Sequence, residues 1–132
     1  MRHHRSKTAL ITLVLKFMRH KDIKSIEAII QRIDSVIDYC RDYDLIRFSE
    51  NTMLIEACVF NLMQIGEISN RNISDHLKSK YPNIPWHSIY GLRNRIVHAY
   101  SDIKLNMVWE TITEDFPQLR KMLGEIRQSL KT

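Results

Sequence analysis

The chain of 132 residues fits a single domain, and its 44% apolar and 27% charged residues suffice for an ordinary globular core. Three Gly and three Pro exclude collagen-like and low-complexity chains, and no apolar run is long enough to span a membrane. The net charge of +5 suggests an acidic partner such as nucleic acid. Seven basic residues and one acidic residue lie within residues 1–24, however, so the remainder of the chain is close to neutral.

Residues 1–17 combine a basic start with a short apolar run and differ in character from the rest. We expect them to be an N-terminal basic extension, with Met18 as an alternative start, before a domain over residues 18–132. A secretory signal fits less well, because Lys16 interrupts the apolar run and no small residues follow it. Cys40 and Cys58 lack a C-x-x-C spacing, so we interpret them as buried free thiols of a cytoplasmic protein.

The apolar pattern predicts helices and no strand. From residue 23 to 40 apolar residues recur with a period near 3.6, which is typical of an amphipathic helix. Asn51 or Thr52 can cap a second helix, and Pro82 and Pro85 separate that helix from a third. The predicted helices cover residues 20–43, 52–78, 86–99, 105–113 and, capped near Asp115, 115–130. The predicted fold is all-α, an antiparallel bundle of about four to five helices.

The second predicted helix has two unusual faces. Its first half, MLIEACVFNLMQI, is apolar almost all round, so it must be covered on more than one side. We expect a second copy of the chain to supply part of that cover, with Ile55 and Leu62 at the interface. Its polar stripe is either a solvated face or the lining of a polar cleft. The stripe consists of Asn61, Gln64, Glu67 and Arg71.

The residues that could carry chemistry lie in GLRNRIVHAY, residues 91–100. On a helix Asn94 and His98 share one face, and Arg93 and Tyr100 share another. Histidine exchanges protons near neutral pH, and the arginine fork matches phosphate. Together they suffice for metal-independent RNA cleavage, in which the ribose 2′-hydroxyl attacks the adjacent phosphate. On spacing alone, a structural histidine beside a surface arginine is the simpler explanation.

Other chemistries have no support in the sequence. There is no H-E-x-x-H motif, no Cys/His metal cluster and no phosphate-binding P-loop. We therefore expect neither a metal nor a cofactor. His20, His76 and His87 are isolated along the chain, and we interpret them as structural or surface residues.

Residues 93–100 resemble the R-x4-H-x-Y motif of HepT-like toxins, which are helical ribonucleases of the HEPN superfamily. IGEIS, YPNIPWHSIYGLRN and VWETITEDFPQL resemble the same family, so the likeness extends over about residues 18–130. The resemblance implies a homodimer whose two motifs face each other in one cleft. It further implies that His98 is the acid/base residue and Arg93 stabilises the phosphate. Asn94 would support them by orienting His98 or the substrate.

The resemblance also implies a partner, an MntA-type nucleotidyltransferase antitoxin that adenylylates Tyr100 in a type VII-like toxin–antitoxin module. Glu67 is expected to pair with Arg93 or Arg95 and to hold the cleft without touching the substrate. The RNA could be a transfer RNA or a messenger RNA. Two alternatives remain: a non-catalytic helical binding module that supports the nucleotidyltransferase, and a purely structural helical dimer.

Overall fold

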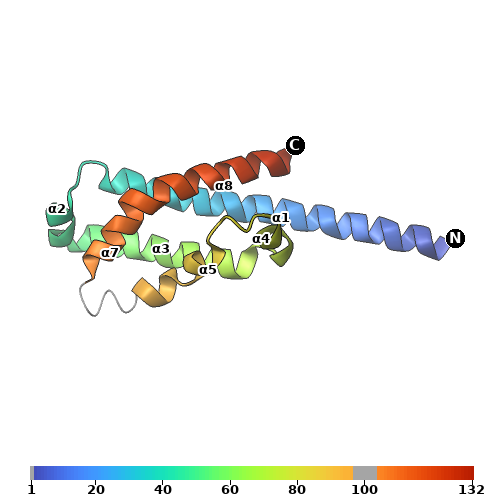
Figure 1. Ribbon diagram of the computed structural model, residues 1–132, viewed down its shortest axis with the longest axis horizontal. Helices are drawn as coiled ribbons and strands as arrows, with labels where there is room; N and C mark the ends of the chain where they lie inside the picture. Colours follow the sequence, from blue (N-terminus) through green and yellow to red (C-terminus); the bar gives the residue numbers. More distant parts are fainter. Residues whose placement is uncertain (1, 97–103) are drawn as a thin grey trace.

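The computed structural model describes residues 2–96 and 104–132, with side chains described from residue 7 onward. Every regular element within these ranges is helical, which confirms the all-α prediction. The long helix α1 (Arg2–Cys40) packs against both α3 (Thr52–Asn72) and α8 (Phe116–Lys131), and both run antiparallel to it (Figure 1). The core lies where these three helices meet.

Helix α1 begins well before the predicted start at residue 20. Residues 2–40 contain no Gly or Pro, so nothing in the chain interrupts the helix. Its first turns project beyond the other helices (Figure 1), and Leu10, Leu13 and Phe17 are exposed there. The periodic apolar residues from 23 to 40 predicted the buried part of α1, but they could not predict where the helix begins. None of the described helices has the length and apolar character needed to cross a lipid bilayer.

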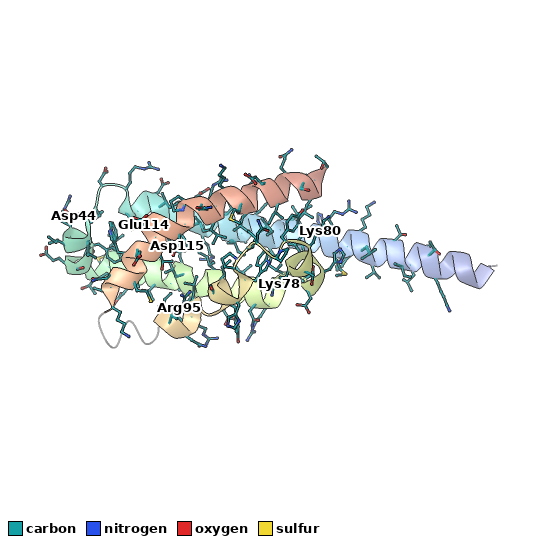
Figure 2. All side chains as sticks on the ribbon, viewed as in Figure 1. Asp44, Lys78, Lys80, Arg95, Glu114 and Asp115 are labelled. Atoms are coloured by element: carbon teal, nitrogen blue, oxygen red, sulfur yellow. The ribbon has the colours of Figure 1, made fainter. Side chains whose placement is uncertain are left out.

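Between the first two predicted helices, where no helix was expected, the chain forms a short helix, α2 (Leu45–Glu50). The side chain of Asp44, at one end of the molecule in Figure 2, caps it by accepting a hydrogen bond from the Arg47 N–H at 2.8 Å. Phe48 is fully buried, and its ring lies 5.0 Å from that of Trp109, centroid to centroid. Burial of this aromatic side chain explains why so short a segment is held as a helix.

The predicted second helix is divided in two. α3 ends at Asn72, and α4 (Asp75–Lys80) follows with Ser74 as its N-cap. The carboxylate of Asp22, 4% exposed on α1, accepts hydrogen bonds from the N–H and the hydroxyl of Ser74 at 2.9 and 2.6 Å. This contact spans 52 residues of sequence, so helical periodicity could not reveal it.

Near the C-terminus two predicted helices are joined into one. α7 (Leu105–Glu110) continues through a π-helical turn, η1 (Thr111–Asp115), into α8. Asp115 was expected to cap a new helix, but its backbone is helical and its side chain caps nothing. Pro117 has no N–H to donate to the preceding turn, and the widened η1 turn accommodates this without a break.

The expected subunit contact through Ile55 and Leu62 is wrong, because both side chains are buried in the core of the single chain. The apolar side chains that α3 leaves exposed are Met53 and Phe60. The prediction of buried free thiols is confirmed for Cys40 and Cys58. Their sulfur atoms lie 3.6 Å apart, and Cys40 together with burial raises the pKa of the Cys58 thiol.

Candidate functional site

The candidate site forms where α5 (Trp86–Tyr90) and the helical turn at 92–96 meet α3. The single helix predicted over 86–99 is interrupted at Gly91, and its last three residues lie outside the described residues. Gly66 lets the two segments approach closely. A Cβ atom built there would lie 3.2 Å from the carbonyl oxygen of Ile89 and 3.6 Å from the backbone nitrogen of Arg93.

This close approach brings Glu67 of α3 beside Arg93. The Arg93 guanidinium donates to Glu67 Oε1 at 2.6 Å, and Nε of Arg71 lies 3.1 Å from Glu67 Oε2. The Glu67 side chain is 29% exposed, against 54% for Arg93 and 73% for Arg71. One carboxylate therefore holds two guanidinium groups at the surface, and the three side chains together carry one net positive charge.

These side chains line a polar cavity of about 190 Å³, which we call the arginine cavity. It is lined by Gly66, Glu67, Asn70, Arg71, Tyr90, Arg93 and Asn94. Its size and charge suit an anionic group such as a phosphate. Asn70 and Tyr90 also line this cavity, although neither belongs to the site predicted from the sequence. The spacing of the residues could have indicated both. In the predicted helix 52–78 an i, i+3, i+4 pattern places Asn70 on one face with Glu67 and Arg71. In the predicted helix 86–99 the same pattern places Tyr90 on one face with Arg93 and Asn94.

The structure thus brings together four of the residues named from the sequence, namely Arg93, Asn94, Glu67 and Arg71. Glu67 pairs with Arg93 and not with Arg95, which resolves the two partners left open by the sequence. His98 and Tyr100 lie outside the described residues.

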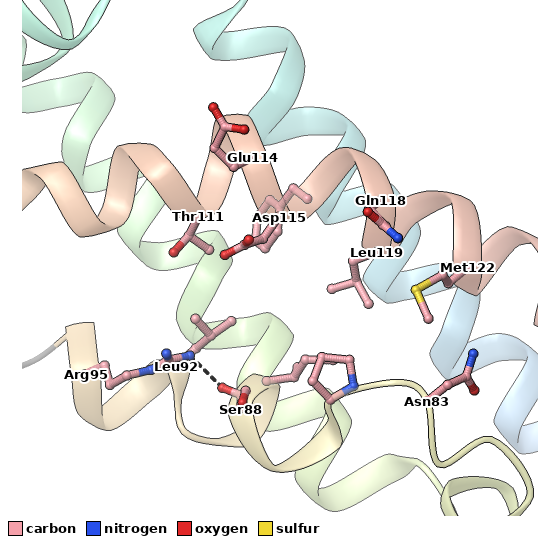
Figure 3. Close-up of a pocket in the computed structure, with 13 residues that line it drawn as sticks. Asn83, Ser88, Leu92, Arg95, Thr111, Glu114, Asp115, Gln118, Leu119 and Met122 are labelled. Carbon is pink, nitrogen blue, oxygen red and sulfur yellow. Dashed lines mark hydrogen bonds between the residues drawn. The ribbon is translucent and has the colours of Figure 1, made fainter.

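Arg95 belongs to a different cavity, of about 330 Å³, between α5 and the η1–α8 segment (Figure 3). Its guanidinium donates to the carbonyl oxygen of Ser88 at 2.7 Å. Glu114 and Asp115 lie across the gap from Arg95 (Figures 2 and 3). The mixed apolar and polar lining of this cavity shares no residue with the arginine cavity.

The residues of the polar stripe on α3 lie in two different environments, the arginine cavity and the contact with α1. Glu67 and Arg71 line the arginine cavity, whereas Asn61 is buried against α1 and accepts a hydrogen bond from Arg32 at 3.2 Å. Within the described part of the chain, no group of three or more His, Cys, Asp and Glu side chains is placed to hold a metal ion.

The chain is thus an all-α protein in which Arg93, the first residue of the R-x4-H segment, pairs with Glu67 and lines a polar cavity. The family model of ribonuclease HepT-like proteins matches residues 26–126, and the chain belongs to this family. The resemblance noted in the motif is therefore confirmed at the level of the family.

Several curated proteins are similar to this chain over most of their length. A protein of Methanocaldococcus jannaschii named as a candidate RNase is 34% identical over 105 residues, which cover 79% of this chain and 95% of the relative. A candidate RNase of Caldanaerobacter subterraneus subsp. tengcongensis is 30% identical over 80% of this chain and 94% of its own length. The "Probable ribonuclease HepT" of Thermococcus cleftensis is 29% identical, covering 83% of this chain and 96% of the relative. No solved structure gives a significant match.

Proposed function

We propose that this chain is a metal-independent endoribonuclease, and the toxin of a toxin–antitoxin pair, in which Arg93 and His98 act on RNA. The observation that carries the proposal is the ion pair between Arg93 and Glu67 in the arginine cavity of a ribonuclease HepT-like protein. A guanidinium is planar and permanently charged, and its donors match phosphate oxygens. Because Glu67 already holds Arg93, little reorganisation is needed when charge develops on the phosphate.

In the proposed reaction His98 takes the proton of the ribose 2′-hydroxyl. The 2′ oxygen attacks the adjacent phosphorus, the bond to the 5′ oxygen breaks, and that oxygen receives a proton. The products are a 2′,3′-cyclic phosphate and a 5′-hydroxyl. Asn94, which lines the cavity beside Arg93, supports the reaction by orienting His98 or the substrate. DNA lacks the 2′-hydroxyl and should not be cut.

The test is cleavage of total cellular RNA by the purified chain in EDTA, with the intact mass measured to exclude a bound nucleotide. Wild-type protein should leave 2′,3′-cyclic phosphate ends. His98→Ala and Arg93→Ala should each slow cleavage by about 10²- to 10⁴-fold. Arg41→Ala is the charge-matched control, because Arg41 is exposed and pairs with Asp38 at the far end of α1.

Two results would decide against this mechanism. Unchanged cleavage by His98→Ala would refute the role of that residue. An unmodified wild-type protein that cuts no cellular RNA would favour the alternative, a non-catalytic binding module for a partner nucleotidyltransferase.

The proposed control of the nuclease is adenylylation of Tyr100 by an MntA-type nucleotidyltransferase antitoxin. Tyr100 follows His98 by two positions, so an attached AMP would add bulk and negative charge beside the catalytic group. RNA would then be excluded sterically and by repulsion between phosphates. Tyr100→Phe should cleave RNA but escape silencing when antitoxin and ATP are added. Silencing of this variant, with the nucleotide on another residue, would show that Tyr100 is not the target.

We also propose that the chain acts as a homodimer with both motifs in one cleft. Support comes from α3, which leaves Met53 and Phe60 exposed although its other apolar side chains are buried or partly buried in the chain's own core. A charged residue at Ile55 or Leu62 would disrupt that core, so Phe60→Glu is the appropriate test. Sedimentation should change from dimer to monomer. A dimer that persists would place the interface on another face.

A further inference from the structure

The arginine cavity contains a second cation that the proposed chemistry does not use. Arg71 lies one helical turn after Glu67 and shares its carboxylate with Arg93, although the two arginines come from different helices. Its side chain is 73% exposed. An exposed ion pair at i, i+4 contributes little to stability, because water screens the two charges. Stabilisation of α3 therefore does not explain why Arg71 lies beside Glu67.

Both guanidinium groups keep most of their donors available. Each arginine carries five N–H donors, and each uses one nitrogen to contact Glu67. In the described part of the chain, neither guanidinium has another acceptor. Glu67 keeps two like charges close together, and within the described residues their remaining donors are available to the oxygens of an anion.

An aromatic ring lies at the same cavity. Tyr90, three positions before Arg93, is 45% exposed and lines the cavity. Its ring is tilted by 50° to that of His87, with the centroids 6.5 Å apart, so His87 does not stack in parallel on its face. An exposed aromatic ring next to paired guanidiniums is the combination with which proteins bind single-stranded nucleic acid, because bases stack on the ring and cations contact the backbone.

We propose that Arg71 and Tyr90 bind the nucleotide next to the cleaved linkage, with Arg71 on its phosphate and the Tyr90 ring on its base. This inference rests on the proposed function, in which Arg93 binds the phosphate that is attacked. The substrate is then a single-stranded stretch of RNA, because a base must leave its helix to stack on a side chain. Arg71 and Tyr90 act in binding and take no part in proton transfer.

The test measures binding separately from cleavage. The probe is a fluorescein-labelled RNA dodecamer of mixed sequence with 2′-fluoro sugars, which cannot be cleaved because the 2′-hydroxyl is absent. Anisotropy titrations over a range of salt concentrations compare the wild type with Arg71→Ala, Tyr90→Ala, Tyr90→Phe and the control Arg41→Ala. Melting temperatures verify that every variant is folded.

Arg71→Ala should reduce the slope of log K against log salt by about 0.7, the loss of one phosphate contact to a single strand. Tyr90→Ala should weaken binding by about 5- to 150-fold, whereas Tyr90→Phe should bind as the wild type does. Arg41→Ala should leave both quantities unchanged. Binding by Arg71→Ala and Tyr90→Ala that equals binding by Arg41→Ala, or a wild type that does not bind the probe, would overturn the inference.

Parallel cleavage assays distinguish this inference from the proposed function. If the wild type cuts RNA and the Arg71 and Tyr90 variants bind the probe normally, the nuclease stands and this subsite is refuted. If no protein cuts RNA but these variants lose binding as described, the nuclease is refuted, and Arg71 and Tyr90 bind single-stranded RNA without a cleaved linkage beside them.

Discussion

The approach of α3 to α5 at Gly66 can be tested with one methyl group. Replacing Gly by Ala inside a helix gains about 1 kcal/mol, because the backbone loses less entropy on folding. At Gly66 the added Cβ would lie 3.2 Å from the backbone oxygen of Ile89, closer than ordinary van der Waals contact, and a backbone atom cannot swing aside. Such overpacking costs about 1–3 kcal/mol. Gly66→Ala should therefore lower the free energy of unfolding by about 0–2 kcal/mol.

Gly124 on α8 provides a matched control. Its added Cβ would lie 3.1 Å from Nη1 of Arg120, the end of a flexible side chain that can move away. Gly124→Ala should keep the full gain of about 1 kcal/mol. The two variants should thus differ by about 1–3 kcal/mol in urea titrations, which corresponds to about 4 °C in melting temperature for each kcal/mol.

Cleavage is the second measurement on this pair. A displacement of α5 by a few tenths of an ångström moves Arg93 relative to Glu67, so Gly66→Ala should lose about threefold to tenfold in cleavage rate. Gly124→Ala should cut RNA at the wild-type rate. If Gly66→Ala is as stable as Gly124→Ala and equally active, close approach at Gly66 does not position the site.

Three further predictions concern the bundle. Asp22→Ala should lower the free energy of unfolding by about 1–3 kcal/mol, because the Ser74 N–H loses its partner in a part-buried position; an unchanged urea midpoint would contradict this. Phe48→Ala should lower the free energy of unfolding by about 3–5 kcal/mol and change the fluorescence of Trp109. An unchanged free energy of unfolding would show that α2 contributes little to the core. Since the contact with Cys40 and burial raise its pKa, Cys58 should react with iodoacetamide at pH 8 only after urea is added, and rapid labelling of folded protein would refute this. The unfolded thiol ionises at about pH 8.5 while the folded thiol stays protonated, so the contribution of Cys58 to stability should fall as the pH rises above that value.

The sequence by itself determined the helical class and the family of the chain. A period of 3.6 residues and the absence of Gly and Pro before residue 41 are local properties, so they identify a helix without knowledge of its neighbours. Pro82 and Pro85 end and start helices through covalent restrictions that act within a few residues. The R-x4-H-x-Y pattern and the longer stretches that resemble the family are likewise local, and together they predicted the family.

Helix boundaries that depend on distant partners could not be obtained in this way. α4 begins directly after its N-cap, Ser74, because the carboxylate of Asp22, 52 residues away, accepts two hydrogen bonds from Ser74. α2 persists because Phe48 is buried. The subunit interface expected at Ile55 and Leu62 was wrong for the same reason. An apolar side chain does not specify whether its own chain or a second copy will cover it.

Only the tertiary structure decided which polar residues form the site. Glu67 and Arg93 are 26 residues apart, and the sequence allowed Glu67 to pair with either Arg93 or Arg95. The choice depends on how closely α3 and α5 pack, and this depends on one position without a side chain, Gly66. The same packing directs Arg95 to a separate cavity and adds Arg71 and Tyr90 to the arginine cavity, because helix faces acquire partners only when helices are packed.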